Sequence, residues 1–297
     1  MKAKRIAATA SSQPSRPRFL AVRGRRLHLR VWGPEEAPTL FFLHGWGDVS
    51  ASYQFVVDHL RRPWRVVAPD ARGFGMSEGN GDAYWFPDYL ADLEAILDAE
   101  SGEEPARIVA HSMGGNVASL YAGIRPERIA ALINLEGFGL RPTQATEAPD
   151  RYRKWLDQVR AGSRFRHYAD RAAFAARLRQ ENPRLSAERA TFLAEHMLAE
   201  GQAGLVPAAD PCHRWVNPVL YRLEEAMACW RAASARVLWV RGEDSFVTRD
   251  FAGREEDYRQ RLACFKGATE IVVPDCGHNL HHDRPDVVAR IIEEFFV

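Results

Sequence analysis

The chain has 297 residues, of which 46% are hydrophobic and 27% are charged, proportions typical of a folded globular protein with a sizeable core. The formal net charge of +1 excludes a general affinity for nucleic acid or acidic surfaces. No apolar run is long enough to span a bilayer, and the opening residues lack the apolar stretch of a secretory signal. The four cysteines form no CxxC pair, so we expect free thiols, no structural zinc and a cytoplasmic protein.

The chain is expected to begin with a flexible basic segment over residues 1–17, which are polar and contain Pro14 and Pro17. Two short β-rich runs follow, Phe19–Val22 and Leu27–Trp32, and they indicate a hairpin around Gly24.

Continuous apolar runs alternate with helical patterns through most of the remaining chain. Such runs are typical of parallel strands that are buried on both faces, and they occur at 39–43, 65–68, 106–110, 129–135, 237–240 and 270–273. Helical spacing of apolar residues occurs at 89–99, 113–124 and 285–296. This alternation predicts an α/β fold with a mostly parallel central sheet flanked by helices.

Residues 137–234 interrupt the alternation. They contain no convincing strand but several amphipathic stretches, at 151–159, 171–178, 187–200 and 219–231. We therefore expect a core formed by 18–136 and 235–297, with an inserted helical cap over 137–234. The cap is rich in aromatic residues, which suit either its own core or the roof of a binding cleft: Trp155, Phe165, Tyr168, Phe174, Phe192, Trp215, Tyr221 and Trp230.

A serine within residues 110–115, Ala-His-Ser-Met-Gly-Gly, lies between an apolar strand and a helix. That context is typical of a nucleophile elbow, although Ala110 replaces the first glycine of the usual Gly-x-Ser-x-Gly pattern. The helix that follows Ser112 offers backbone amides and a favourable dipole to an oxyanion. Ser112 is the candidate nucleophile, and the alternative is a structural turn.

Two further motifs supply the groups that a serine nucleophile requires. His44-Gly45-Trp46-Gly47 follows an apolar strand, and we expect the Trp46 and Met113 amides to form the oxyanion hole. His278 follows the last strand and is the candidate general base. His281 and His282 lie close by, but no carboxylate at a recognisable sequence spacing completes a metal site with them.

These motifs and Asp70–Ser77 occur in the order that is typical of the α/β-hydrolase superfamily. The chain resembles that superfamily from about residue 19 to 297. The resemblance implies a Ser-His-acid triad and leaves two positions for the acid. Many relatives place it after strand 7, where this chain has Ser245 at the usual position and Asp244 one residue earlier. Serine hydrolase-like proteins and one haloalkane dehalogenase subgroup place it after strand 6, where this chain has Glu136. We favour Glu136 as the acid, with Asp244 as the alternative. Either residue could instead be a solvated loop carboxylate with no catalytic role.

The expected function is hydrolysis of a carboxylic ester or thioester through an acyl-enzyme, with no cofactor and no metal. The expected substrate is a small molecule with an apolar acyl or aromatic group, and neither nucleic acid nor stable membrane insertion is expected. Acyl transfer, amide or peptide cleavage and C–C bond hydrolysis are alternatives on the same triad. A ligand-binding receptor on the same fold is the non-enzymatic alternative, because a fold does not fix a function.

Overall fold

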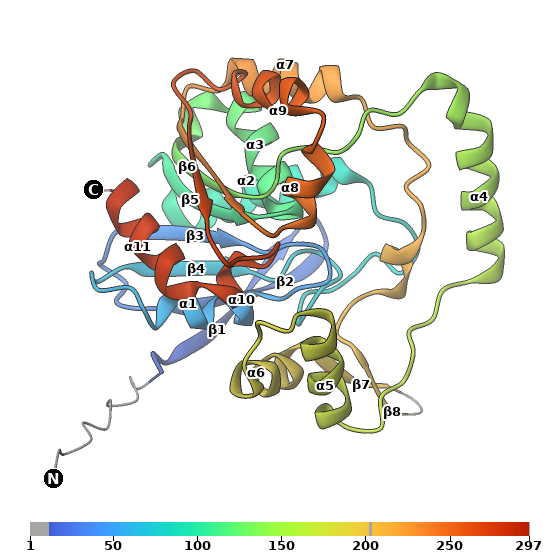
Figure 1. Ribbon diagram of the computed structural model, residues 1–297. Coiled ribbons are helices and arrows are strands. Elements are labelled where there is room, and N and C mark those ends of the chain that lie inside the picture. The colour runs from blue at the N-terminus through green and yellow to red at the C-terminus, as the bar shows by residue number, and fades with distance from the viewer. Residues whose placement is uncertain (1–11, 202–203, 297) are drawn as a thin grey trace, which may run out of the picture.

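The computed structural model describes residues 12–201 and 204–296, and within them a twisted eight-stranded sheet forms the centre of the molecule (Figure 1). The strand order is β1-β2-β4-β3-β5-β6-β9-β10. The strands are β1 (Ser15–Val22), β2 (Arg25–Trp32), β3 (Thr39–Leu43), β4 (Arg65–Pro69), β5 (Ala106–His111), β6 (Ile129–Leu135), β9 (Arg236–Gly242) and β10 (Thr269–Val273). Only β2 runs against its neighbours, so the predicted α/β fold with a mostly parallel sheet is confirmed.

The N-terminal hairpin forms around Gly24, but its first strand begins earlier than expected. β1 starts at Ser15 and pairs with β2 as far as Trp32. The prediction of a flexible segment to residue 17 is therefore wrong for 15–17, and residues 1–11 lie outside the described residues. The guanidinium of Arg16 bonds to the Gly33 carbonyl and pairs with Glu35, which ties this end of β1 to the turn after β2.

Helices cover both faces of the sheet and bury two large apolar clusters against it. On one face lie α2 (Phe86–Ser101), α3 (Met113–Ile124), η2 (Pro126–Arg128), α7 (Leu223–Ala232), α8 (Phe246–Phe251) and α9 (Glu255–Leu262). On the other lie η1 (Ser50–Tyr53), α1 (Gln54–Val57), α10 (Leu280–Asp283) and α11 (Pro285–Phe295). The last helix follows the expected spacing, with Val287, Val288, Ile291 and Ile292 buried.

The insertion after β6 contains helices and a small two-stranded sheet. Its elements are η3 (Ala145–Glu147), α4 (Ala148–Ala161), α5 (Arg171–Glu181), α6 (Ala187–Met197), β7 (Leu198–Gly201), β8 (Gly204–Pro207) and η4 (Pro211–Arg214). The expectation that this segment lacks strands is wrong, because β7 and β8 pair antiparallel. A third cluster of buried side chains joins α5, α6 and β8 to Phe55 of the core.

The end of the insertion returns to the core before β9 begins. Helix α7 packs on α3, and its Trp230 is 1% exposed against Trp239 and Phe265. Helix α4 instead stands away from the sheet (Figure 1), and it contains no buried residue. No helix in 12–201 or 204–296 combines the length and apolar character needed to cross a bilayer.

Candidate active site

Ser112 occupies the sharp turn between β5 and α3. Its backbone has a φ of 49° and a ψ of −110°, a strained conformation for a residue other than glycine. The turn is held by the Ser112 amide, which donates to the Leu135 carbonyl at 2.8 Å. It also requires a close approach behind the serine, since a Cβ on Gly114 would lie 2.5 Å from the Leu43 carbonyl oxygen. The side chain of Ser112 is consequently presented above the carboxyl ends of the strands.

His278 reaches this serine from the loop between β10 and α10. Its Nε2 lies 3.1 Å from Ser112 Oγ, within hydrogen-bond distance, although the two residues are 166 positions apart in the sequence. The ring packs against Phe246, with ring centroids 4.5 Å apart, and its side chain is 19% exposed. The imidazole can therefore exchange a proton with the serine while one side remains open to a substrate.

Glu136 lies on the other side of the same imidazole, directly after β6. Its Oε2 is 2.5 Å from His278 Nδ1, and its side chain is fully buried. The carboxylate accepts two more hydrogen bonds, from the Gly242 amide to Oε1 at 2.7 Å and from Ser245 Oγ to Oε2 at 2.5 Å. These donors come from β9 and the turn after it, so two neighbouring strand ends fix the orientation of the carboxylate.

Asp244, the alternative acid, points elsewhere. Its side chain is 47% exposed and forms an ion pair with Arg184 of the insertion. Its amide donates to the Cys276 carbonyl at 3.0 Å. The structure thus brings Ser112, His278 and Glu136 together and leaves Asp244 at the surface.

The turn that carries Trp46 lies beside the nucleophile. A Cβ on Gly45 would be only 3.2 Å from Ser112 Cβ, which shows how closely the two loops approach. Met113 is the first residue of α3, and amides of the first helical turn have no partner within the helix. Gly45, which precedes Trp46, and Met113 therefore both lie next to Ser112, an arrangement compatible with the predicted oxyanion hole.

No role was assigned from the sequence to three residues of this region. Ser245 replaces the usual acid and instead donates to Glu136. His111 donates through Nε2 to the carbonyl of His278 at 2.9 Å. Asp48 lies against His281 and His282, a contact that joins residues more than 200 positions apart and leaves no signal in local spacing.

A cleft of about 740 Å³ opens between α4 and the helices α2, α3 and α7. Asn116 lines it and lies four residues after Ser112, roughly 6 Å along the axis of α3. Apolar side chains from both sides face the cleft, including Trp85, Phe86, Leu90, Leu120, Leu140 and Tyr152. The cleft thus begins one helical turn along α3 from Ser112, but Ser112, His278 and Glu136 are not among its lining residues.

Comparison with known proteins agrees with this fold. Residues 38–285 match the family described as the alpha/beta hydrolase fold, and the chain belongs to that family. It is 28% identical to a serine hydrolase-like protein of Danio rerio, over 90% of this chain and 83% of that protein. Serine hydrolase-like protein 2 of Homo sapiens is 25% identical, over 93% of this chain and 92% of the relative. A solved thioesterase domain from the curacin biosynthetic pathway matches with a TM-score of 0.84 at 26% identity, over 95% of this chain and 99% of the domain. The resemblance inferred from the motifs is confirmed.

Proposed function

We propose that this α/β hydrolase cleaves a carboxylic ester or thioester through a covalent acyl-enzyme on Ser112. The observation that carries the proposal is the continuous chain from Glu136 through His278 to Ser112, with separations of 2.5 and 3.1 Å. A serine hydroxyl is a weak nucleophile unless a base of this kind lies beside it. Similarity to serine hydrolase-like proteins and to a thioesterase domain supports the same chemistry.

In the acylation step, Ser112 Oγ attacks the carbonyl carbon of the substrate while His278 Nε2 takes the serine proton. Glu136 accepts a hydrogen bond from His278 Nδ1, which leaves Nε2 free to act as the base and stabilises the charged imidazolium. The amides of Trp46 and Met113 donate to the carbonyl oxygen as it becomes an oxyanion. The alcohol or thiol then leaves with the proton from His278.

In the deacylation step, water attacks the acyl carbon on Ser112. His278 takes a proton from that water and afterwards returns a proton to Ser112 Oγ as the carboxylic acid leaves. The same oxyanion donors serve both steps. The cycle therefore uses the side chains and amides described above and restores them at its end.

The substrate is expected to present an apolar acyl or aromatic group to the cleft beneath α4. Asn116, one helical turn after Ser112, lines this cleft, and apolar side chains line it on both sides. Burying an apolar chain there would contribute about 25 cal/mol for each Å² removed from water. We expect medium or long acyl esters and thioesters to be better substrates than acetyl esters.

A covalent probe tests the proposal directly. A fluorophosphonate should label the wild-type protein and should not label Ser112→Ala, because only an activated serine attacks the phosphorus centre. Equal labelling of the two folded proteins would exclude Ser112 as the nucleophile. Absence of labelling in both would favour the non-enzymatic alternative, a ligand-binding receptor.

A panel of esters, thioesters, amides and acyl acceptors separates the remaining alternatives. Release of free acid from esters or thioesters in water is the expected result. Preferential transfer of the acyl group to an added alcohol or amine would identify an acyltransferase, and faster turnover of amides would identify an amidase.

A further inference from the structure

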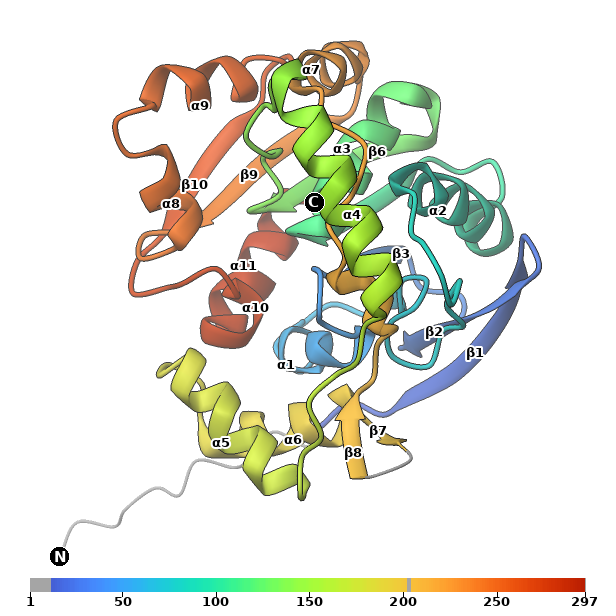
Figure 2. The ribbon, with the colours of Figure 1, turned by 90° about the vertical axis from the view of Figure 1, so that its right-hand side faces the viewer.

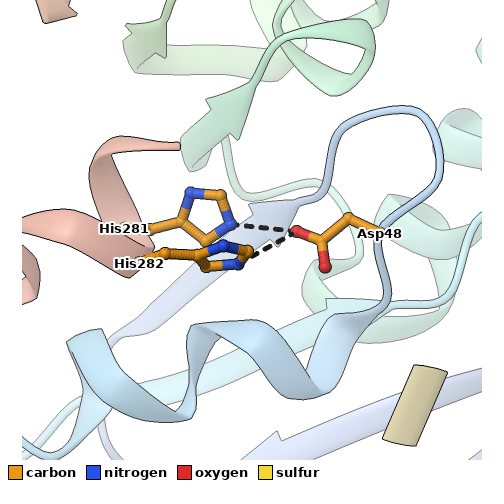
Figure 3. Close-up of side chains that lie close together, drawn as sticks. All are labelled: Asp48, His281 and His282. Carbon is orange, nitrogen blue, oxygen red and sulfur yellow. Dashed lines mark hydrogen bonds and ion pairs between the residues drawn. The ribbon is translucent and has the colours of Figure 1, made fainter. Parts of the chain in front are cut away.

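A buried carboxylate and two histidines lie behind the triad, on the side away from the cleft. Figure 3 shows Asp48, in the loop after β3, with His281 and His282 of α10 pointing toward it. His281 Nε2 lies 2.9 Å from Asp48 Oδ2, whereas His282 Nε2 lies 3.6 Å away, beyond hydrogen-bond distance. His281 is fully buried, and Asp48 and His282 are nearly so.

The Asp48 carboxylate is held on both oxygens. Oδ1 accepts from the Val49 amide at 2.8 Å, and Oδ2 accepts from Ser52 Oγ at 2.8 Å as well as from His281. Burial alone would raise the pKa of Asp48, but the hydrogen bond from His281 and the nearby imidazole of His282 outweigh burial and hold this pKa well below its usual range. Asp48 is therefore a carboxylate at neutral pH.

His281 is neutral under the same conditions. Burial, with a smaller effect of neighbouring His282, lowers the pKa of His281 to about 4, although Asp48 acts in the opposite direction. A neutral imidazole has one N–H, and the partner of Nε2 is a carboxylate that can only accept, so the proton lies on Nε2. Tyr53 packs on the ring with centroids 5.0 Å apart.

His111 forms the next link, between the nucleophile and the catalytic histidine. It immediately precedes Ser112, and its Nε2 donates to the backbone carbonyl of His278 at 2.9 Å. Burial, followed by the effects of His281 and His278, holds the pKa of His111 well below its usual range. The ring centroid lies 4.7 Å from that of His278 and 4.6 Å from that of His281. A neutral, enclosed imidazole of fixed tautomer thus joins the two catalytic segments.

These contacts connect three segments that are distant in the sequence. The first is the loop of Trp46 and Asp48, the second is the elbow of Ser112, and the third runs from His278 into α10. Asp48 joins the first segment to the third through His281, and His111 joins the second to the third. His281 lies only three residues after His278, so a shift of α10 would move the catalytic imidazole.

We propose that Asp48, His281 and His111 are positioning residues that hold these three segments in register for catalysis. The inference rests on the proposed function of Ser112 and adds to it a second, buried carboxylate–histidine pair. None of the three side chains needs to touch the substrate. They act through the Trp46 amide, Ser112 and His278, whose mutual distances set the rate of the chemical step.

The proposal predicts that variants of these positioning residues have a lower kcat at each correctly folded active site. Displacing a catalytic group by about 1 Å can reduce the rate by about 100-fold. We expect Asp48→Ala and His111→Leu each to lower kcat for a short acyl ester by about 10- to 100-fold, with KM changed less than about threefold. The second-order rate of fluorophosphonate labelling should fall in parallel, because it depends on the same alignment.

Conservative variants distinguish positioning from bulk packing. The side-chain amide of Gln reaches about as far as histidine Nε2 and can donate to the His278 carbonyl, so His111→Gln should recover much of the activity that His111→Leu loses. Asp48→Asn keeps an oxygen acceptor for His281 and should retain more activity than Asp48→Ala. His196→Gln, which removes a half-buried histidine from α6 of the insertion, is the matched control and should leave kcat unchanged.

Active sites are counted by fluorophosphonate titration, so every rate refers to protein that is correctly folded. A purely structural role would reduce the number of titratable sites and leave kcat per site at the wild-type value, which would overturn the proposal. Equal activity of His111→Gln and His111→Leu would also overturn it. So would one equivalent of tightly bound zinc whose removal abolishes activity, because ligand atoms of Asp48, His281 and His282 lie within 4.8 Å of one another and would then bind the metal. If Ser112→Ala remains active, the proposed function itself fails, and that result is independent of these variants.

Discussion

Glu136 combines a strained backbone conformation with a buried carboxylate side chain. Its φ of 61° lies in the left-handed region, as does that of Ser112 at 49°. Each turn follows the end of a parallel strand, where the chain must leave the sheet sharply. For Glu136, three hydrogen bonds to the carboxylate hold the side chain of this turn against His278, Ser245 and Gly242.

Removing the charge of Glu136 should impair catalysis far more than removing that of Asp244. In Glu136→Gln, the amide group replaces one acceptor oxygen with a donor, so it cannot satisfy all three donors that now surround it. By the serine-protease precedent, loss of the triad acid costs on the order of 10⁴ in kcat. We expect a fall of several orders of magnitude, measured by active-site-titrated turnover of an ester.

Asp244→Asn is the matched comparison, because it makes the same change of carboxylate to amide in the turn after the neighbouring strand β9. It weakens only a half-exposed ion pair with Arg184, of a kind worth at most about 1 kcal/mol. Turnover within about twofold of wild type is expected. A large loss in Asp244→Asn together with mild effects in Glu136→Gln, on proteins with native circular dichroism, would transfer the role of acid to Asp244.

Sequence patterns located the individual chemical groups better than the contacts between them. Ser112 and His278 follow apolar strands in motifs whose glycines leave a clear signal. Glu136 could be selected because the chain resembles relatives that place the acid after strand 6, where parallel strand ends meet at one edge of the sheet. Ser245 could not be assigned, since a serine in a turn has many uses and its partner lies 109 residues away. The link from Asp48 to His281 spans 233 residues and depends on tertiary packing alone.

At the scale of elements, the segment around η4 attaches the insertion to the core. The His213 ring stacks between Phe74 and Tyr84, with centroid distances of 4.0 and 3.6 Å. Backbone hydrogen bonds join the same regions, from the Gly75 amide to Ala208 at 2.7 Å and from the Asp210 amide to Gly73 at 2.7 Å. The insertion is thus attached to the turn after β4 by both aromatic and backbone contacts.

His213 should make the fold sensitive to mild acid. Burial lowers the pKa of His213 to about 4, with a smaller effect of His44, although the Arg72 carbonyl and Asp210 oppose the shift. Between that value and about 6.5, the unfolded chain binds a proton that the folded chain does not, so stability falls as pH falls. From pH 7 to pH 5, this one group should reduce the free energy of unfolding by about 2 kcal/mol.

The variant His213→Phe retains an aromatic ring for the stack but cannot titrate. Urea denaturation of both proteins at pH 7 and pH 5 should show a smaller pH-dependent loss for His213→Phe, by about 2 kcal/mol. An identical loss in the two proteins would mean that other groups account for the acid sensitivity.

Long, regular elements were predicted well, and short ones in the insertion were not. The core strands are continuous apolar runs, and α3 and α11 have clear helical spacing, so local pattern and tertiary burial agree. β7 contains Leu198-Ala-Glu-Gly201, a sequence with little preference for a strand, and it continues from α6. It pairs with β8 because their residues pack beside Tyr168, a tertiary effect that a single-sequence pattern does not contain.

At the scale of the whole molecule, α4 crosses in front of the central strands of the sheet (Figure 2), and none of its residues is buried. One side of this helix carries Tyr152, Leu156 and Val159, which lie on one face because they are four and three residues apart. Their exposures of 52%, 55% and 39% are large for apolar residues on a helix. Tyr152 lines the cleft, and the charged residues Arg153, Lys154 and Asp157 occupy another side of α4.

We therefore expect the apolar side of α4 to set the preference for acyl chain length. Tyr152→Ser should lower kcat/KM for an octanoyl ester by about tenfold, because Tyr152 lines the cleft and losing the contact of one apolar side chain with the acyl group costs about 1.5 kcal/mol. An acetyl ester is too short to reach one helical turn beyond Ser112, so its kcat/KM should change little. Lys154→Ser on the charged side is the matched control and should leave the octanoyl-to-acetyl ratio unchanged. A ratio that stays constant in both variants would mean that α4 is a scaffold and that the acyl group binds elsewhere.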